Sequence, residues 1–181
     1  MTEYLLRYLL LMAILLPLWA AFRRPHRHWC CHEGLLMLFG GLLCLVLDGT
    51  WAAPAEMLSA AHTRLATGEK LQLQPLFTIR RMLAYGTVDE ILINLWGNVV
   101  MFVPFGFFLP LLWARFRHPF VMVLCCLLLP IAIECSQLFI GRMTDIDDIL
   151  LNFIGGMLGS GFFLILHRCF PDFTTLCLER K

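Results

Sequence analysis

The stretch ILLNFIGGMLGSGFFLIL, Ile149–Leu166, decides the class of fold. It contains no charged side chain and is near the length that an α-helix needs to cross the hydrocarbon core of a bilayer. Further apolar runs of similar length precede it, at Tyr4–Phe22, Gly34–Ala53, Ile91–Trp113 and Phe120–Ile140. Together these runs predict an all-α integral membrane protein, a bundle of about five transmembrane helices.

The composition favours a membrane protein over a soluble one. Hydrophobic residues make up 60% of the 181 residues and charged residues 15%, whereas an average soluble domain has about 25% charged residues. The formal net charge of +1 gives no support to nucleic-acid binding, which would require Lys and Arg gathered on one face. We therefore expect one compact bundle with membrane lipids around it and no nucleic-acid partner.

The cysteines and histidines predict neither a disulfide framework nor a structural zinc site. Most of the cysteines fall within or at the ends of apolar runs, where they act as small packing residues. The segment His26–His32 has suitable ligand types but lacks the paired C-x-x-C spacing of zinc sites. We therefore predict no metal ligands, and the sequence identifies no cofactor.

Basic residues predict the orientation of the bundle. They follow the first, third and fifth apolar runs, as Arg23, Arg24 and Arg27, then Arg115 and Arg117, then Arg168, Arg180 and Lys181. These connections lie on one side, which the positive-inside rule makes cytoplasmic, so the N-terminus is expected outside and the C-terminus inside. The longer segment Pro54–Glu90, with basic residues of its own and a predicted interfacial helix at Met57–Leu65, would lie outside.

Polar residues recur at the outer ends of the last three runs. Three pairs share a helix face because their members are three or four residues apart: Asn94 with Asn98, Glu134 with Gln137, and Asp148 with Asn152. The loop between the last two runs adds Arg142, Asp145 and Asp147. Under the predicted topology these residues converge at one membrane depth and form a binding site.

Glu134 and the loop acids each have a structural explanation as well as a functional one. A charged side chain near the centre of a bilayer costs about 2.5–3.5 kcal/mol, so Glu134 either serves function or forms an ion pair with Arg142 or Arg80. Thr144 followed by Asp147 fits a helix-capping pattern. The whole set suits either a hard cation such as Mg²⁺ or Ca²⁺, or a phosphate or sugar headgroup held by Arg142.

Small residues predict close helix packing beneath the site. Gly155 with Gly159 and Gly156 with Ser160 form small-xxx-small patterns, which let a neighbouring helix approach. In the third run, Pro104 and Gly106 are expected to kink or loosen the helix beneath Asn98.

These motifs carry a family resemblance. The pattern Asn94-x-x-Gly97-Asn98-x-x-x-Phe102-x-Pro104-x-Gly106, then Glu134-x-x-Gln137, then Arg142-x-x-Asp145-x-Asp147-Asp148-x-x-x-Asn152-x-x-Gly155-Gly156 closely resembles the VanZ-like family over roughly Leu71–Gly161. The segment Gln72-Leu73-Gln74-Pro75-Leu76 departs from the Asn-Leu-Ile-Pro-Phe-like sequence of relatives. The resemblance implies a small multi-pass protein of the bacterial inner membrane, whose namesake is linked to teicoplanin resistance.

The resemblance divides the chain and orders the functional hypotheses. Residues 1–70 would hold two N-terminal helices and part of the outer loop, residues 71–166 the VanZ-like domain, and residues 167–181 a short cytoplasmic tail. The first hypothesis is a non-enzymatic protein whose outward pocket binds an envelope lipid or a lipid-linked cell-wall intermediate and influences susceptibility to glycopeptide antibiotics. The alternatives are an enzyme acting on a lipid phosphate or glycolipid, with Glu134 or Asp148 as base or metal ligand, and a transporter.

Overall fold

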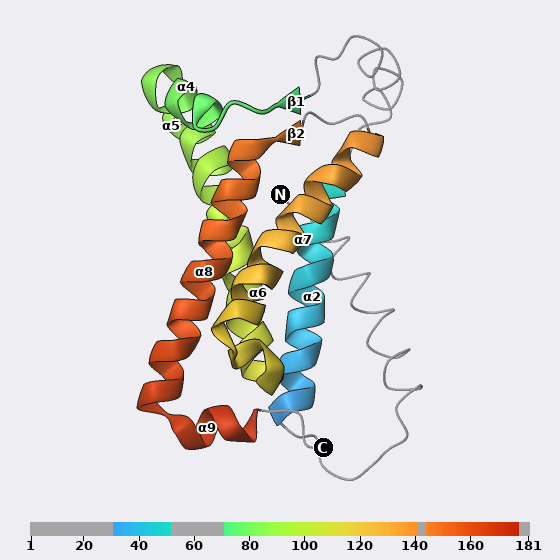
Figure 1. Cartoon of the computed structure of the whole chain (residues 1–181), viewed down its shortest axis with the longest axis vertical. Coiled ribbons are helices and arrows are strands. Elements are labelled where there is room, and N and C mark those ends of the chain that lie inside the picture. Colours follow the sequence, from blue (N-terminus) through green and yellow to red (C-terminus); the bar gives the residue numbers. More distant parts are fainter. Residues whose placement is uncertain (1–30, 52–70, 141–143, 178–181) are drawn as a thin grey trace.

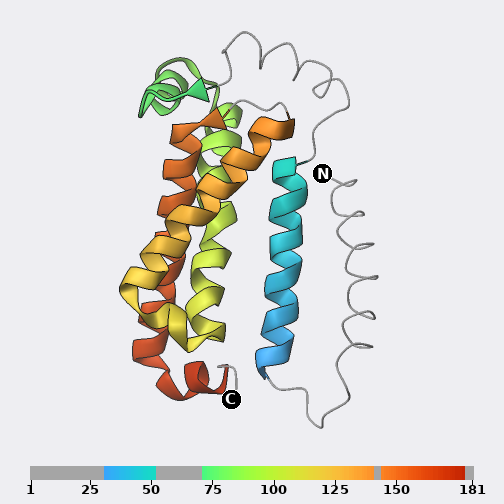
Figure 2. The same ribbon diagram turned by 45° about the vertical axis from the view of Figure 1, so that its right-hand side comes forward.

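The computed structural model describes residues 31–51, 71–140 and 144–177. Long helices run side by side in this part of the chain (Figure 1, Figure 2): α2 (Cys31–Trp51), α6 (Gly97–Leu112), α7 (Pro119–Ile140) and α8 (Ile146–Cys169). Successive helices run in opposite directions. The connection between α7 and α8 therefore lies at one end of the bundle, and the turn between α6 and α7 lies at the other.

Within the described residues, three continuous helices are long and apolar enough to cross a membrane: Val88–Leu112, Pro119–Gln137 and Ile146–Cys169. They contain most of the third, fourth and fifth predicted runs. The second predicted run corresponds to α2, whose shorter apolar stretch is His32–Cys44. The first predicted run and the interfacial helix at Met57–Leu65 lie outside the described residues. The helical membrane-type bundle is confirmed, and the number of about five spans stays a prediction.

The starts of two of these helices follow from local capping. Thr87 and Glu90 form a reciprocal capping box, in which each side chain accepts a hydrogen bond from the other's backbone N–H. This box begins α5 (Val88–Glu90), which continues through the π-helical segment η1 (Ile91–Trp96) into α6. Asp145 caps α8, because its Oδ1 accepts a hydrogen bond of 2.9 Å from the backbone N–H of Asp147. The prediction that Thr144 caps this helix is therefore wrong.

Helices α6 and α8 approach each other at glycines. A Cβ atom on Gly155 would lie 2.1 Å from the Val99 carbonyl oxygen, and one on Gly159 would lie 2.0 Å from the Val103 carbonyl oxygen. Such contacts are too short for any side chain, so the predicted role of these glycines in close packing is confirmed. Helix α6 continues unbroken through Pro104, and the irregular backbone lies before Asn98, in η1.

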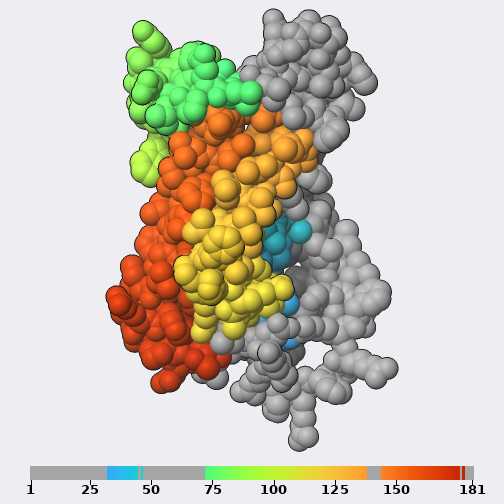
Figure 3. All heavy atoms as spheres, in the orientation of Figure 1, coloured from blue at the N-terminus to red at the C-terminus, as the bar shows by residue number. Residues whose placement is uncertain are grey.

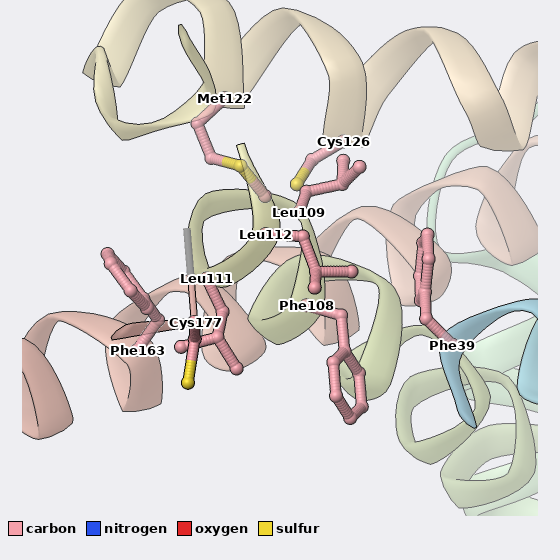
Figure 4. Close-up of a cluster of buried hydrophobic side chains, with 9 residues drawn as sticks. All are labelled: Phe39, Phe108, Leu109, Leu111, Leu112, Met122, Cys126, Phe163 and Cys177. Carbon is pink, nitrogen blue, oxygen red and sulfur yellow. The ribbon is translucent and has the colours of Figure 1, made fainter. Parts of the chain in front are cut away.

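The apolar core lies in the half of the bundle next to the α6–α7 turn. Figure 4 shows its buried members, which come from four helices and the residue after α9 (Pro171–Leu176): Phe39, Phe108, Leu109, Leu111, Leu112, Met122, Cys126, Phe163 and Cys177. Because Cys177 belongs to this core, part of the segment predicted as a tail packs against the bundle.

Arg117 ties α9 to this end of the bundle. Its Nε donates to the Pro110 carbonyl and its Nη2 donates to the Thr174 carbonyl, both at 3.0 Å. Its guanidinium lies over the Phe163 ring, 5.2 Å from the centroid. Burial lowers the pKa of Arg117 from its ordinary value, although a guanidinium stays charged in proteins.

The opposite end of the bundle carries a small folded cap. Strand β1 (Leu71–Gln72) pairs in parallel with β2 (Thr144–Asp145), with Leu71 opposite Thr144 and Gln72 opposite Asp145. Helix α4 (Phe77–Tyr85) follows, and Figure 3 shows this segment covering the end of α8. The two short strands, which the all-α prediction did not include, position the polar residues described next.

Candidate polar site at one end of the bundle

A group of buried or half-buried polar side chains lies where α6, α7 and α8 meet β2 (Figure 1). Glu134 is 2% exposed and Asn152 is 4% exposed, although both sit on apolar helices. We call the group the polar layer, and its members are Asn98, Glu134, Gln137, Thr144, Asp145, Asp147, Asp148 and Asn152. These residues come from three helices and one strand, and they lie together at one end of the bundle. The sequence predicted this location for all of them except Thr144.

Glu134 holds the connection that leads into α8. Its Oε2 accepts a hydrogen bond of 3.3 Å from the backbone N–H of Asp145, and its backbone carbonyl accepts one of 3.3 Å from the Thr144 hydroxyl. Arg142, one of its predicted partners, lies outside the described residues. Arg80, the other, is exposed on α4. Glu134 therefore has a structural role in addition to any role in binding.

Asp147 caps a helix other than its own. Its carboxylate accepts hydrogen bonds from the backbone N–H groups of Leu76, Thr78 and Ile79, the last two at 2.8 and 3.1 Å. These donors form the N-terminus of α4, which has no side-chain cap of its own. A carboxylate satisfies such N–H groups strongly, because the bond is charge-assisted and the helix dipole favours negative charge there. Asp147, which is 1% exposed, thus fastens the 71–85 segment to α8.

The two asparagines at the start of the third span have different surroundings. Asn98 Nδ2 donates to Asp148 Oδ1 at 2.7 Å and so links α6 to α8. Asn94 is exposed, and its Nδ2 donates to the Glu90 carbonyl at 3.0 Å. Of the two amides, Asn98 bonds to α8, whereas Asn94, in η1, bonds within its own helix.

At this end of the bundle, two buried polar atoms have no hydrogen-bond partner among the described residues. They are Asn152 Oδ1 on α8 and Gln72 Nε2 on β1. The sequence predicted Asn152 as a site residue but missed Gln72 and Thr144. Local sequence could not reveal them, because the β1–β2 pairing places Thr144 in the polar layer and Gln72 beside it.

The described residues offer little for metal or nucleophilic chemistry. No group of three or more His, Cys, Asp or Glu side chains among them is placed to hold a metal ion. Ser136 Oγ donates to the Ile133 carbonyl at 2.6 Å, within its own helix. The described histidines, His32, His118 and His167, are at the end of the bundle away from the polar layer. A serine–histidine pair is therefore not formed within this part of the chain.

Comparison with protein families identifies the chain. The family model VanZ/LLP1 matches residues 8–167, which include every member of the polar layer. The chain belongs to the VanZ/LLP1 family. The resemblance seen in the motifs is thereby confirmed, and neither the curated proteins nor the solved structures gave a match.

The structure explains why the motif of this VanZ/LLP1 protein has its spacing. Asp145 begins α8, Asp147 reaches the N-terminus of α4, and Asp148 reaches Asn98 on α6. About two and three turns further along α8, Gly155 and Gly159 press against the α6 backbone. The segment Asp145–Gly159 therefore contacts α4 and then α6, in the order in which its residues follow one another from the polar end of the bundle toward the other end.

Proposed function

We propose that this VanZ/LLP1 protein is a non-enzymatic membrane protein whose polar layer binds the headgroup of an envelope lipid or of a lipid-linked cell-wall intermediate. The observation that carries the proposal is the burial of Glu134 and Asn152 within apolar helices. Polar groups at such positions are costly, and they commonly mark functional sites in membrane proteins. Among the described residues, no three His, Cys, Asp or Glu side chains are placed to hold a metal ion, so the proposal names a headgroup as the ligand.

The proposed orientation places the polar layer at the outer face of a bacterial inner membrane. Arg115, Arg117 and Arg168 lie at the opposite end of the bundle, which the positive-inside rule assigns to the cytoplasm. The N-terminus would then be outside and the C-terminus inside. In this orientation the polar layer meets envelope lipids on the side where glycopeptide antibiotics act.

We propose further that binding at this layer lowers susceptibility to teicoplanin by changing how the antibiotic reaches its target at the membrane surface. This step rests on the link between the family's namesake and that antibiotic. The alternative, an enzyme acting on a lipid phosphate or glycolipid, has weaker support because Ser136 is bonded within its own helix and the described histidines are distant.

The proposal is tested in bacterial cells that express the full chain. We expect wild-type protein to raise the teicoplanin concentration that inhibits growth and to reduce the binding of fluorescent teicoplanin to cells. Glu134→Gln, which keeps the size of the side chain but removes its charge, should return both values to those of cells with empty vector. Asn94→Ala is the matched control, because Asn94 is exposed and bonded to its own helix.

The amount of protein in the membrane must be equal for all variants, as measured by immunoblot. Full protection by Glu134→Gln at equal amounts would contradict a role for the polar layer. Equal loss with Asn94→Ala would show that the assay does not report on this site.

A further inference from the structure

Most of the polar layer is already committed to holding the fold. Glu134 and Asp145 accept hydrogen bonds from backbone N–H groups around β2. Asp147 caps α4, and Asp148 accepts a hydrogen bond from Asn98. Each of these acids therefore has at least one hydrogen-bond partner within the protein and does not need a ligand to satisfy it.

Asn152 differs from these acids. The side chain is 4% exposed, and its Oδ1 has no hydrogen-bond partner within the described ranges. It lies one helical turn beyond Asp148 on α8, so it faces the same side of the helix. Native proteins satisfy nearly all buried polar atoms, and a carbonyl oxygen left alone destabilises the fold. Such an exception calls for a group that donates a hydrogen bond.

The next turn of α8 closes the site on the side away from the polar end. A Cβ on Gly155 would lie 2.1 Å from the Val99 carbonyl oxygen of α6, and one on Gly156 would lie 2.9 Å from Cys126 Sγ of α7. The three helices are thus in contact immediately beyond Asn152. In the proposed complex the headgroup would therefore approach Asn152 from the end where β1 and β2 lie.

We infer that Asn152 Oδ1 accepts a hydrogen bond from the bound headgroup, so the site selects a headgroup that carries a donor, an ammonium or a hydroxyl group, over one that offers only phosphate oxygens. The inference deepens the proposed function and rests on it. Phosphate oxygens are acceptors, so they cannot donate the hydrogen bond that Asn152 Oδ1 lacks. Ammonium and sugar hydroxyl groups donate to carbonyl and carboxylate oxygens alike.

The test compares lipids that differ in their donors. Full-length protein is purified, and lipid binding is measured by native mass spectrometry with phosphatidylethanolamine, phosphatidylcholine, diglucosyl diacylglycerol and phosphatidic acid. Both phosphatidylethanolamine and phosphatidylcholine have a cationic nitrogen, which carries N–H donors in the first and three methyl groups in the second. We expect a donor lipid to bind about tenfold more tightly than phosphatidylcholine and phosphatidic acid, as one hydrogen bond to a buried carbonyl would give.

The two donor lipids distinguish the source of the ligand chemistry. Preference for phosphatidylethanolamine over phosphatidylcholine identifies an ammonium headgroup. Preference for diglucosyl diacylglycerol identifies a sugar hydroxyl. Equal binding of all four lipids by the wild-type protein would overturn the inference.

Asn152→Leu separates a ligand contact from a structural contact. Leucine has a similar volume and no acceptor, so we expect the donor preference to fall about tenfold while the lipid-free protein unfolds at an equal or higher temperature. Asn152→Ala is a second variant in case leucine is not accommodated, and Asn94→Leu is the matched control that should change neither value.

Two other outcomes have distinct meanings. Lower stability with an unchanged donor preference in both Asn152 variants would give Asn152 a structural role and overturn the inference, while the proposed function would stand. Failure of the wild-type protein to bind any of the lipids above the level of Glu134→Gln would instead overturn the proposed function as well.

Discussion

Asp147 shows how a single side chain can connect distant parts of this chain. It leads into α8, yet its carboxylate accepts the N–H groups at the start of α4, which precedes it by two spanning helices. Glu134 does the same for β2 through a longer bond of 3.3 Å. Glu134, Asp145 and Asp147 therefore accept hydrogen bonds from backbone N–H groups, and Asp148 accepts one from the side chain of Asn98.

Asp147→Ala should release α4 from the bundle. The substitution leaves buried N–H groups without an acceptor and removes a helix cap, so we expect a loss of about 1–3 kcal/mol in stability. Trypsin should then cleave faster after Arg80 or Arg81, both exposed on α4. Thermal unfolding in detergent and the cleavage rate provide the measurements. Asp89→Ala is the control, since Asp89 is an exposed acid on the neighbouring α5, and equal cleavage of both variants would disprove the anchoring role.

At the scale of elements, the contact between α6 and α8 depends on backbone proximity. Gly106, Gly155 and Gly159 bring the two backbones so close that an added Cβ atom would lie within about 2 Å of a carbonyl oxygen. Apolar attraction alone cannot drive this contact in lipid, where the surroundings are equally apolar. The close fit of the two helix surfaces therefore favours the contact between α6 and α8. The hydrogen bond from Asn98 to Asp148 sets the register of these two helices at their polar end.

Gly159→Ala should destabilise this pair, whereas Gly161→Ala should not. The methyl group at position 159 would lie 2.0 Å from the Val103 carbonyl oxygen, and overpacking of this kind costs about 1–3 kcal/mol. A methyl group at position 161 meets no atom within 4 Å and gains helix propensity of up to about 1 kcal/mol. Unfolding of both variants in detergent or SDS titrations measures the difference. Similar stability of the two variants would contradict the close contact.

At the scale of the whole molecule, the two ends of the bundle have different chemistry. One end holds the polar layer under the β1–β2 pair and α4, and the other holds the apolar core closed by Arg117 and α9. Arg115 and Arg168 lie at the core end, and Arg80 and Arg81 lie on α4 at the polar end. This polarity is the basis for proposing that the polar layer faces outward.

Thiol labelling of intact cells tests the orientation. In a cysteine-free background, we expect Tyr85→Cys to react with a membrane-impermeant reagent, because Tyr85 is 88% exposed near the polar end. Asp172→Cys, exposed on α9 at the other end, should react only after the membrane is opened. The reverse pattern would place the polar layer in the cytoplasm and exclude direct action on antibiotic access.

Features that depend on local composition and regular spacing could be predicted from the amino-acid sequence. Ile149–Leu166 is apolar enough to predict a spanning helix, and the glycines at 155 and 159 predict close packing on one face. Glu134 and Gln137 share a face because α7 is a regular helix over that stretch. These predictions held because each depends on residues within a few turns of one another.

Sequence patterns did not predict which polar groups meet and which stay unsatisfied. Asn94 is exposed and donates to the Glu90 carbonyl, whereas Asn98 reaches Asp148 on α8. Asp147 bonds to α4 instead of capping its own helix, and strand pairing places Gln72 opposite Asp145 of the polar layer. The packing of the whole bundle sets which groups that are distant in sequence form hydrogen bonds with each other. The same packing buries Asn152 Oδ1 without a hydrogen-bond partner among the described residues.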